Sequence, residues 1–206
     1  GGDADFGVAP AAFTHRIPEA LALVDAAPLL CAGITVFAPL RRAGNVAGKT
    51  VAVAGMGGLG HLAVRMAAAM GAHVVAILRG QGKAEFARKM GAHEIVDSGK
   101  EKIGPALAGM GGADLILVTG ISARLFEQCI PGLGPNGTMV LLSAVAENAS
   151  ILPSGLLTGQ KRIMGSLIGT RDDMDAMLRF AADHGIRAVV ERHPLSAVNE
   201  VLSKLR

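Results

Sequence analysis

Short aliphatic runs and amphipathic stretches alternate along most of the chain. A run of β-branched and apolar residues between turn residues is typical of a buried strand, whereas apolar residues every three or four positions are typical of a helix. The predicted strands begin at Val51 and continue with His73–Leu78, Glu94–Val96, Asp114–Thr119, Thr138–Ser143 and Arg162–Ile168. Helices are expected after the first strand as far as Met70, over Lys83–Met90, and from Ser122 to the break at Pro131 and Gly132. This order predicts an α/β fold with a doubly wound parallel sheet covered on both faces.

Two further helices are predicted in the last part of the sequence. Thr170 is expected to cap the first of them, with Asp173 three residues later and Gly185 after its end. The apolar stripe of this helix consists of Met174, Met177, Leu178 and Ala181. The last helix, from Ser196, repeats the spacing with Val198, Val201, Leu202 and Leu205. Both stripes are expected to pack against the core.

Three glycines, Gly55, Gly57 and Gly60, follow the first strand and open the first helix. Gly55 permits a sharp turn, Gly57 lets the backbone approach a pyrophosphate, and Gly60 lets the helix pack close to the strand. The phosphates would then lie at a helix N-terminus, where free N–H groups favour anions. In a chain with 28 glycines the spacing alone is a weak signal. Its position between a strand and a helix predicts a dinucleotide site.

The residues after the second strand predict which dinucleotide binds. An Asp or Glu at this strand end accepts hydrogen bonds from the adenosine ribose, but here Leu78 is followed by Arg79 and, four residues on, by Lys83. Two cations and no acid suit a 2′-phosphate, so we expect NADP(H) rather than NAD. The alternative is that Arg79 and Lys83 are ordinary solvated surface residues.

The composition excludes several other classes of partner. The net charge of +3 would suit nucleic acid, but the basic residues are scattered and the chain has no Trp or Tyr to stack on bases. The uncharged stretch Ala26–Leu40 contains Pro28 and Pro39 and is shorter than the ~20 residues of a membrane span. We therefore expect neither a nucleic-acid nor a membrane partner.

The cysteines and the first residues indicate the compartment and the extent of the chain. Cys31 and Cys129 lack C-x-x-C spacing, and no secretory signal is visible, which favours the cytoplasm. Because the sequence begins with Gly rather than Met, we expect a fragment of a longer protein. Residues 1–28 do not share the alternating pattern and are typical of a segment that crosses from another unit.

Two other nucleotide-binding classes use similar glycine turns. A methyltransferase that binds S-adenosylmethionine generally has an acid at the second strand end, and none is present here. The segment Gly44–Thr50 resembles a phosphate-binding loop of nucleoside triphosphatases, but it has one residue too few and precedes a strand. Cys31 remains unassigned at this point, because a Cys in an apolar run is more often a buried hydrophobe than a metal ligand.

The segments Ala27–Leu40 and Val51–His61, taken together, resemble the zinc-containing medium-chain alcohol dehydrogenases. The resemblance covers essentially the whole chain and is strongest to the branch similar to cinnamyl alcohol dehydrogenase, which reduces aldehydes with NADPH. It implies a Rossmann-type domain over residues 29–184, a remnant of a GroES-like catalytic domain over 1–28, and the start of a return segment over 185–206. In such enzymes zinc polarises the carbonyl group and the cofactor delivers hydride.

The resemblance also implies a role for individual residues. Cys31 matches a ligand of the catalytic zinc, and Thr35 matches a catalytic residue that packs beside the nicotinamide. Arg79 and Lys83 fall where the family selects its cofactor. The pyrophosphate turn corresponds to Gly55, Gly57, Gly58, Leu59 and Gly60, and the strand ends that line the nicotinamide correspond to Val118, Thr119, Leu142, Ser143 and Ile168.

The departures from the family limit the expected activity. The other zinc ligands of the family, a Cys and the His and Glu of a Gly-His-Glu motif, have no match in this sequence, so we expect the chain alone to be inactive. The apolar edge strand 162–169 is expected to form a homodimer. The alternatives are a zinc-free quinone or enoyl reductase of the same superfamily, against which Cys31 argues, and a non-catalytic module that binds NADPH.

Overall fold

The computed structural model describes residues 6–204 and contains a six-stranded parallel sheet. The strand order is β3-β2-β1-β4-β5-β6, with the chain starting in the middle and winding outward in both directions. The strands are β1 (Thr50–Ala54), β2 (His73–Leu78), β3 (Glu94–Asp97), β4 (Ala113–Val118), β5 (Leu133–Leu141) and β6 (Arg162–Gly165). The predicted α/β doubly wound fold is therefore confirmed.

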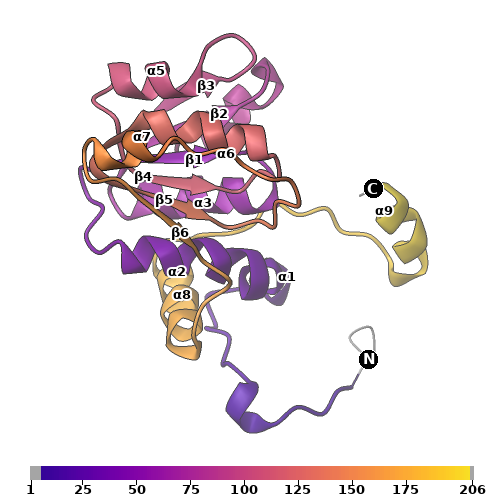
Figure 1. The fold of residues 1–206 in the computed structure, drawn as a ribbon. Coiled ribbons are helices and arrows are strands. Elements are labelled where there is room, and N and C mark those ends of the chain that lie inside the picture. Colours follow the sequence, from indigo (N-terminus) through magenta and orange to yellow (C-terminus); the bar gives the residue numbers. More distant parts are fainter. Residues whose placement is uncertain (1–5, 205–206) are drawn as a thin grey trace.

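Helices cover both faces of the sheet, as Figure 1 shows. Val51 and Val53 of β1 point to one face and Ala52 and Ala54 to the other, and all four are fully buried. This explains why the central strands are apolar at every position. The first face carries α2 (Ile34–Arg42), α3 (Gly58–Ala69), α4 (Ala84–Lys89) and α8 (Arg171–Asp183), and the second face carries α5 (Ile103–Gly109) and α6 (Ala123–Cys129).

A helical run that the sequence patterns did not predict precedes the sheet. α1 (Leu23–Pro28), a π-helical turn (Leu29–Gly33) and α2 follow one another without a break, so the run continues across the expected boundary at residue 28. By length and composition this run, Leu23–Arg42, could cross a membrane, since it has 20 residues and contains an 18-residue segment with a mean hydropathy of 1.8. However, 56% of this segment is buried inside the protein, as is usual for the core helix of a folded domain.

Helix α8 agrees with its prediction. Thr170 Oγ1 accepts a hydrogen bond from the Asp173 N–H, and the Asp173 carboxylate accepts one from the Thr170 N–H, which forms a capping box. The predicted stripe faces the core, with Met177 and Leu178 almost completely buried. The chain then leaves the helix at Gly185, where φ is +62°.

The last helix forms as predicted, but the expectation that its apolar stripe packs against the core is wrong. Helix α9 (Val198–Lys204) has no buried residue, and Val198 and Leu202 are 38% and 52% exposed. Figure 1 shows α9 standing away from the sheet. The spacing of apolar residues in an amphipathic helix indicates that one face is apolar, but it does not indicate which surface covers that face. Leu205 lies outside the described residues.

Other boundaries differ by a few residues. β6 ends at Gly165. It could not extend through Ile168 as predicted, because Ile168 has a left-handed φ of +52° that a strand cannot contain. β5 begins at Leu133 and has an irregular register opposite β4. The short helices α5 and α7 (Pro153–Leu157) were not predicted, since each is too short to show a full apolar period.

Candidate functional site

The turn between β1 and α3 has the geometry that a pyrophosphate requires. Gly55 has a φ of +107°, a conformation that L side chains rarely adopt. A Cβ on Gly60 would lie 1.9 Å from the carbonyl oxygen of Gly55, so only glycine allows this close contact between helix and strand. At Gly57 and Gly58, by contrast, a Cβ would find no atom within 4 Å. The turn is therefore closed toward the protein and open toward solvent.

The first N–H groups of α3 point into this open space. Gly57 is the N-cap and provides no side chain to pair with them, so the N–H groups of the first helical turn are available to an anion. His61 braces the turn from behind, because its Nδ1 lies 3.1 Å from the Gly57 carbonyl oxygen and its Nε2 accepts from the Val189 N–H at 3.1 Å. These contacts connect the turn to the backbone at Val189, and its N–H groups can receive phosphate groups.

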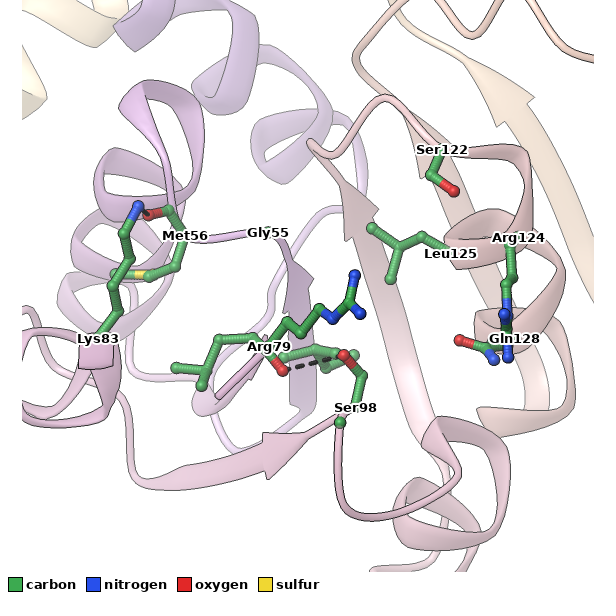
Figure 2. A pocket seen from close by; sticks show the side chains of 12 residues that line it. Gly55, Met56, Arg79, Lys83, Ser98, Ser122, Arg124, Leu125 and Gln128 are labelled. Carbon is green, nitrogen blue, oxygen red and sulfur yellow. Dashed lines mark hydrogen bonds between the residues drawn. The ribbon is translucent and has the colours of Figure 1, made fainter. Parts of the chain in front are cut away.

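A pocket of about 600 Å³ extends from this turn along the ends of β2 and β3. Figure 2 shows Arg79 reaching across it, with Lys83 on one side and Arg124 and Gln128 on the other. The ammonium group of Lys83 donates to the Met56 carbonyl at 3.1 Å. The Arg79 guanidinium makes no hydrogen bond or ion pair within the described part of the chain. Arg79 and Lys83 therefore line the same pocket, and Arg79 is available to a ligand.

A buried acid that the sequence patterns did not single out supports this pocket. Asp97, at the end of β3, is 3% exposed, and its Oδ1 accepts from the N–H groups of Gly80 and Gly99 at 2.8 and 3.0 Å. It fixes the loop that presents Arg79. The acid ends the third strand rather than the second, so the usual rule for a ribose-binding residue could not identify it.

Other lining residues were also missed. They belong to the turn after β1, the loop after β3, and α6 with its N-cap, and they are Met56, Ser98, Gly99, Ser122, Arg124, Leu125 and Gln128. All of them follow the carboxyl end of a strand in the chain. Ligands of open α/β sheets bind at the carboxyl ends of the strands. The position of these residues after strand ends was therefore the signal that could have identified them as lining residues.

The predicted strand-end residues gather at the same edge. Thr119 donates its N–H to the Ala54 carbonyl at 2.9 Å, and its hydroxyl lies 3.1 Å from the carbonyls of Ala54 and Gly55. Leu142 donates its N–H to Val118, and the Ser143 hydroxyl donates to Gly120 at 2.8 Å. The ends of β1, β4 and β5 are thereby tied together beside the glycine turn.

Cys31 and Thr35 lie on the helical run below this edge. Thr35 is 7% exposed and donates its hydroxyl to the Cys31 carbonyl at 2.7 Å. Cys31 is an exposed free cysteine, whereas Cys129 is buried, and burial raises the pKa of the Cys129 thiol to about 12. Catalytic zinc takes three protein ligands. Within residues 6–204 no three His, Cys, Asp or Glu side chains form a group that could hold a metal, so the residues present do not fit a zinc centre.

Comparisons with known proteins agree with this architecture. Residues 58–183 match the family model described as zinc-binding dehydrogenase. An alcohol dehydrogenase of Geobacillus stearothermophilus is 35% identical over 213 residues, which cover 100% of this chain and 61% of that protein. A cinnamyl alcohol dehydrogenase from Sorghum bicolor superposes with a TM-score of 0.83 at 35% identity, covering 92% of this chain and 54% of that one.

A further solved structure carries a cofactor. The cinnamyl alcohol dehydrogenase of Helicobacter pylori, complexed with NADP(H), is 29% identical with a TM-score of 0.77 and covers 89% of this chain and 52% of that one. The chain thus spans a little more than half the length of the proteins it matches. It belongs to the zinc-containing medium-chain alcohol dehydrogenase family, of which it holds the cofactor-binding portion.

Proposed function

We propose that the chain is the NADP(H)-binding part of a zinc-dependent alcohol dehydrogenase or aldehyde reductase. Arg79 is the observation that carries the choice of cofactor, since an unpaired guanidinium lies where an NAD-binding protein has an acid. The family relative from Helicobacter pylori is complexed with NADP(H). The open glycine turn and the pocket at the β2 end are together large enough for the adenosine half of such a cofactor.

The proposed reaction divides between the cofactor and the protein. When bound, the nicotinamide would accept or donate the hydride exchanged with an alcohol or aldehyde. In this chain the backbone N–H groups after Gly57 would hold the pyrophosphate, Arg79 and Lys83 would hold the 2′-phosphate, and the ends of β4 and β5 would flank the nicotinamide. Thr35 would pack beside the nicotinamide ring.

The zinc ligands have to come from elsewhere if the whole protein uses zinc. Cys31 supplies one thiol, and the described residues provide no group of ligands around it. We therefore propose that the remaining ligands belong to a part of the protein outside these 206 residues. The 206-residue chain alone is then expected to bind the cofactor without reducing aldehydes.

Replacing Arg79 by Ala tests the cofactor proposal. Loss of a charge-assisted contact of about 1.5–3 kcal/mol should weaken NADPH binding about tenfold or more. NADH, which lacks the 2′-phosphate, should bind almost as before. Titration calorimetry measures both affinities, because the chain has no Trp or Tyr to report binding by fluorescence. Arg88→Ala, on the exposed end of α4 and outside the pocket, is the matched control. Equal losses for both cofactors would contradict the assignment.

We also propose that the protein is a homodimer paired through the edge strand within residues 162–169. β6 is the last strand of the sheet, and Met164 and Leu167 are 41% and 91% exposed. A charge on such an edge opposes pairing, so Met164→Asp is expected to shift a dimer to a monomer in sedimentation velocity. Met110→Asp changes a methionine of the same exposure away from this edge and should leave the dimer intact. A monomeric wild-type chain at high concentration would refute the proposal.

A further inference from the structure

The turn between β6 and α8, residues 166–170, contains an unusual backbone conformation. Ile168 has a φ of +52°, and a β-branched residue in the left-handed region is strained. Such a conformation persists only where surrounding contacts determine it, and it is found more often at functional sites. The contacts that hold this turn therefore indicate the function for which the strained conformation is kept.

Arg42, at the end of α2, contacts the first residue of the turn and the α8 carboxylate that is bonded to its last residue. Its Nη1 donates to the Ser166 hydroxyl at 3.1 Å, and its Nη2 donates to Asp173 Oδ2 at 3.2 Å. The same Asp173 oxygen accepts the Thr170 N–H at 2.9 Å. The first end of the turn is also attached to the sheet, because the Ser166 N–H donates to the Leu141 carbonyl at 3.0 Å. One guanidinium thus fixes the span in which Ile168 lies.

Gly169, near the second end of the turn, lies close against α2. A Cβ on Gly169 would be 2.9 Å from Cγ1 of Ile34 and 3.0 Å from Cβ of Ala38. The backbone therefore approaches the helix as closely as glycine permits, which leaves the turn little freedom to move. Ile168, the preceding residue, is 43% exposed.

The turn lies at the ligand-binding edge of the sheet. β5 and β6 are parallel and pair Leu141 with Gly165, so the turn follows the carboxyl end of β6 beside Leu142 and Ser143. A dinucleotide spans the two halves of a doubly wound sheet. With the pyrophosphate at the β1 turn and the 2′-phosphate at the β2 end, the nicotinamide half has to lie over β4, β5 and the turn after β6.

We propose that Arg42 is a positioning residue, which holds the 166–170 turn so that its backbone meets the nicotinamide half of the cofactor. Arg42 touches no cofactor itself and acts through Ser166 and Asp173. The inference rests on the proposed NADP(H) binding. It assigns a task in cofactor binding to an arginine at the far end of α2, which no sequence pattern marks.

Arg42→Gln is the decisive variant, and Arg41→Gln is its matched control. Arg41 also donates to Asp173, at 2.9 Å, but it does not contact Ser166. Both variants lose one arginine contact to the same carboxylate, so their effects on thermal stability should be similar. Calorimetry would compare two ligands, NADPH and 2′-phospho-ADP-ribose, which lacks the nicotinamide ring.

Arg42→Gln is expected to weaken NADPH binding about fivefold and to leave 2′-phospho-ADP-ribose unchanged, whereas Arg41→Gln changes neither. Ser166→Ala should reproduce the selective loss, and it decides the question if Arg42→Gln does not fold. An equal loss for both ligands, the same selective loss in Arg41→Gln, or unchanged NADPH binding in the Arg42 and Ser166 variants overturns the inference. If the wild-type chain binds neither ligand, the cofactor proposal itself fails, and this inference fails with it.

Discussion

Replacing Gly60 by Ala is expected to lower the free energy of unfolding by about 3 kcal/mol or more. The added methyl group would lie 1.9 Å from the carbonyl oxygen of Gly55, and the nearest atoms are backbone atoms that cannot move aside as a flexible side chain can. Helix α3 has to separate from β1, which distorts the turn before it. NADPH affinity should therefore fall more than tenfold along with stability.

Gly109→Ala provides the control for this prediction. Gly109 is also a helical glycine, at the end of α5, but a Cβ there would find no atom within 4 Å. Alanine has the better helix propensity, so stability should stay the same or rise slightly. Urea denaturation followed by circular dichroism measures both variants. A Gly60→Ala protein as stable as Gly109→Ala would show that α3 and β1 are not in the close contact described.

The fold could be predicted to the extent that neighbouring residues in the chain determine it. The strands of the sheet centre are buried on both sides, so they appear as continuous apolar runs, as in Asp114–Thr119. The roles of Gly55 and Gly60 could also be predicted, because the positive φ of Gly55 and the close approach of Gly60 to the Gly55 carbonyl oxygen involve only residues close in the chain. The helical run Leu23–Arg42 was missed because Pro28 and Pro39 are signals against a helix interior, and here tertiary packing overrides them.

The site was only partly predictable, because several of its features depend on residues distant in sequence. Arg79 and Lys83 could be singled out from the sequence because both follow the end of one strand within a few residues. Asp97 could not, since its role arises where the loops of two neighbouring strands meet. The left-handed Ile168 could not be expected from an isoleucine, which favours extended backbone. Its conformation is imposed by α2 and α8, and no local pattern records that contact.

Asp173 is the second position at which a large effect is expected. Its side chain is 8% exposed and accepts hydrogen bonds from Thr170, Arg41 and Arg42. Burial alone would raise the pKa of this carboxyl group, but the hydrogen bonds from Thr170 and Arg41 and the charge of Arg42 outweigh burial and lower the pKa. The folded state therefore favours the carboxylate, and protonation opposes folding.

Asp173→Asn should lower the free energy of unfolding by about 2–3 kcal/mol at neutral pH, because an amide keeps the cap but loses the charge-assisted contacts. Asp172→Asn removes a carboxylate from the same helix turn, but Asp172 is exposed, so this change should cost less than about 0.5 kcal/mol.

The pH dependence separates this electrostatic role from simple packing. A carboxyl group whose pKa is lowered on folding stabilises the protein above its unfolded pKa of about 3.9, and the contribution is lost as the pH falls through the folded value. The difference in stability between wild type and Asp173→Asn should thus be constant from pH 8 to about pH 5 and shrink at more acidic pH. Thermal unfolding across this range measures it. A difference that persists unchanged in acid would mean that Asp173 acts through its shape, and that Arg41 and Arg42 contribute no charge-dependent stability to the turn.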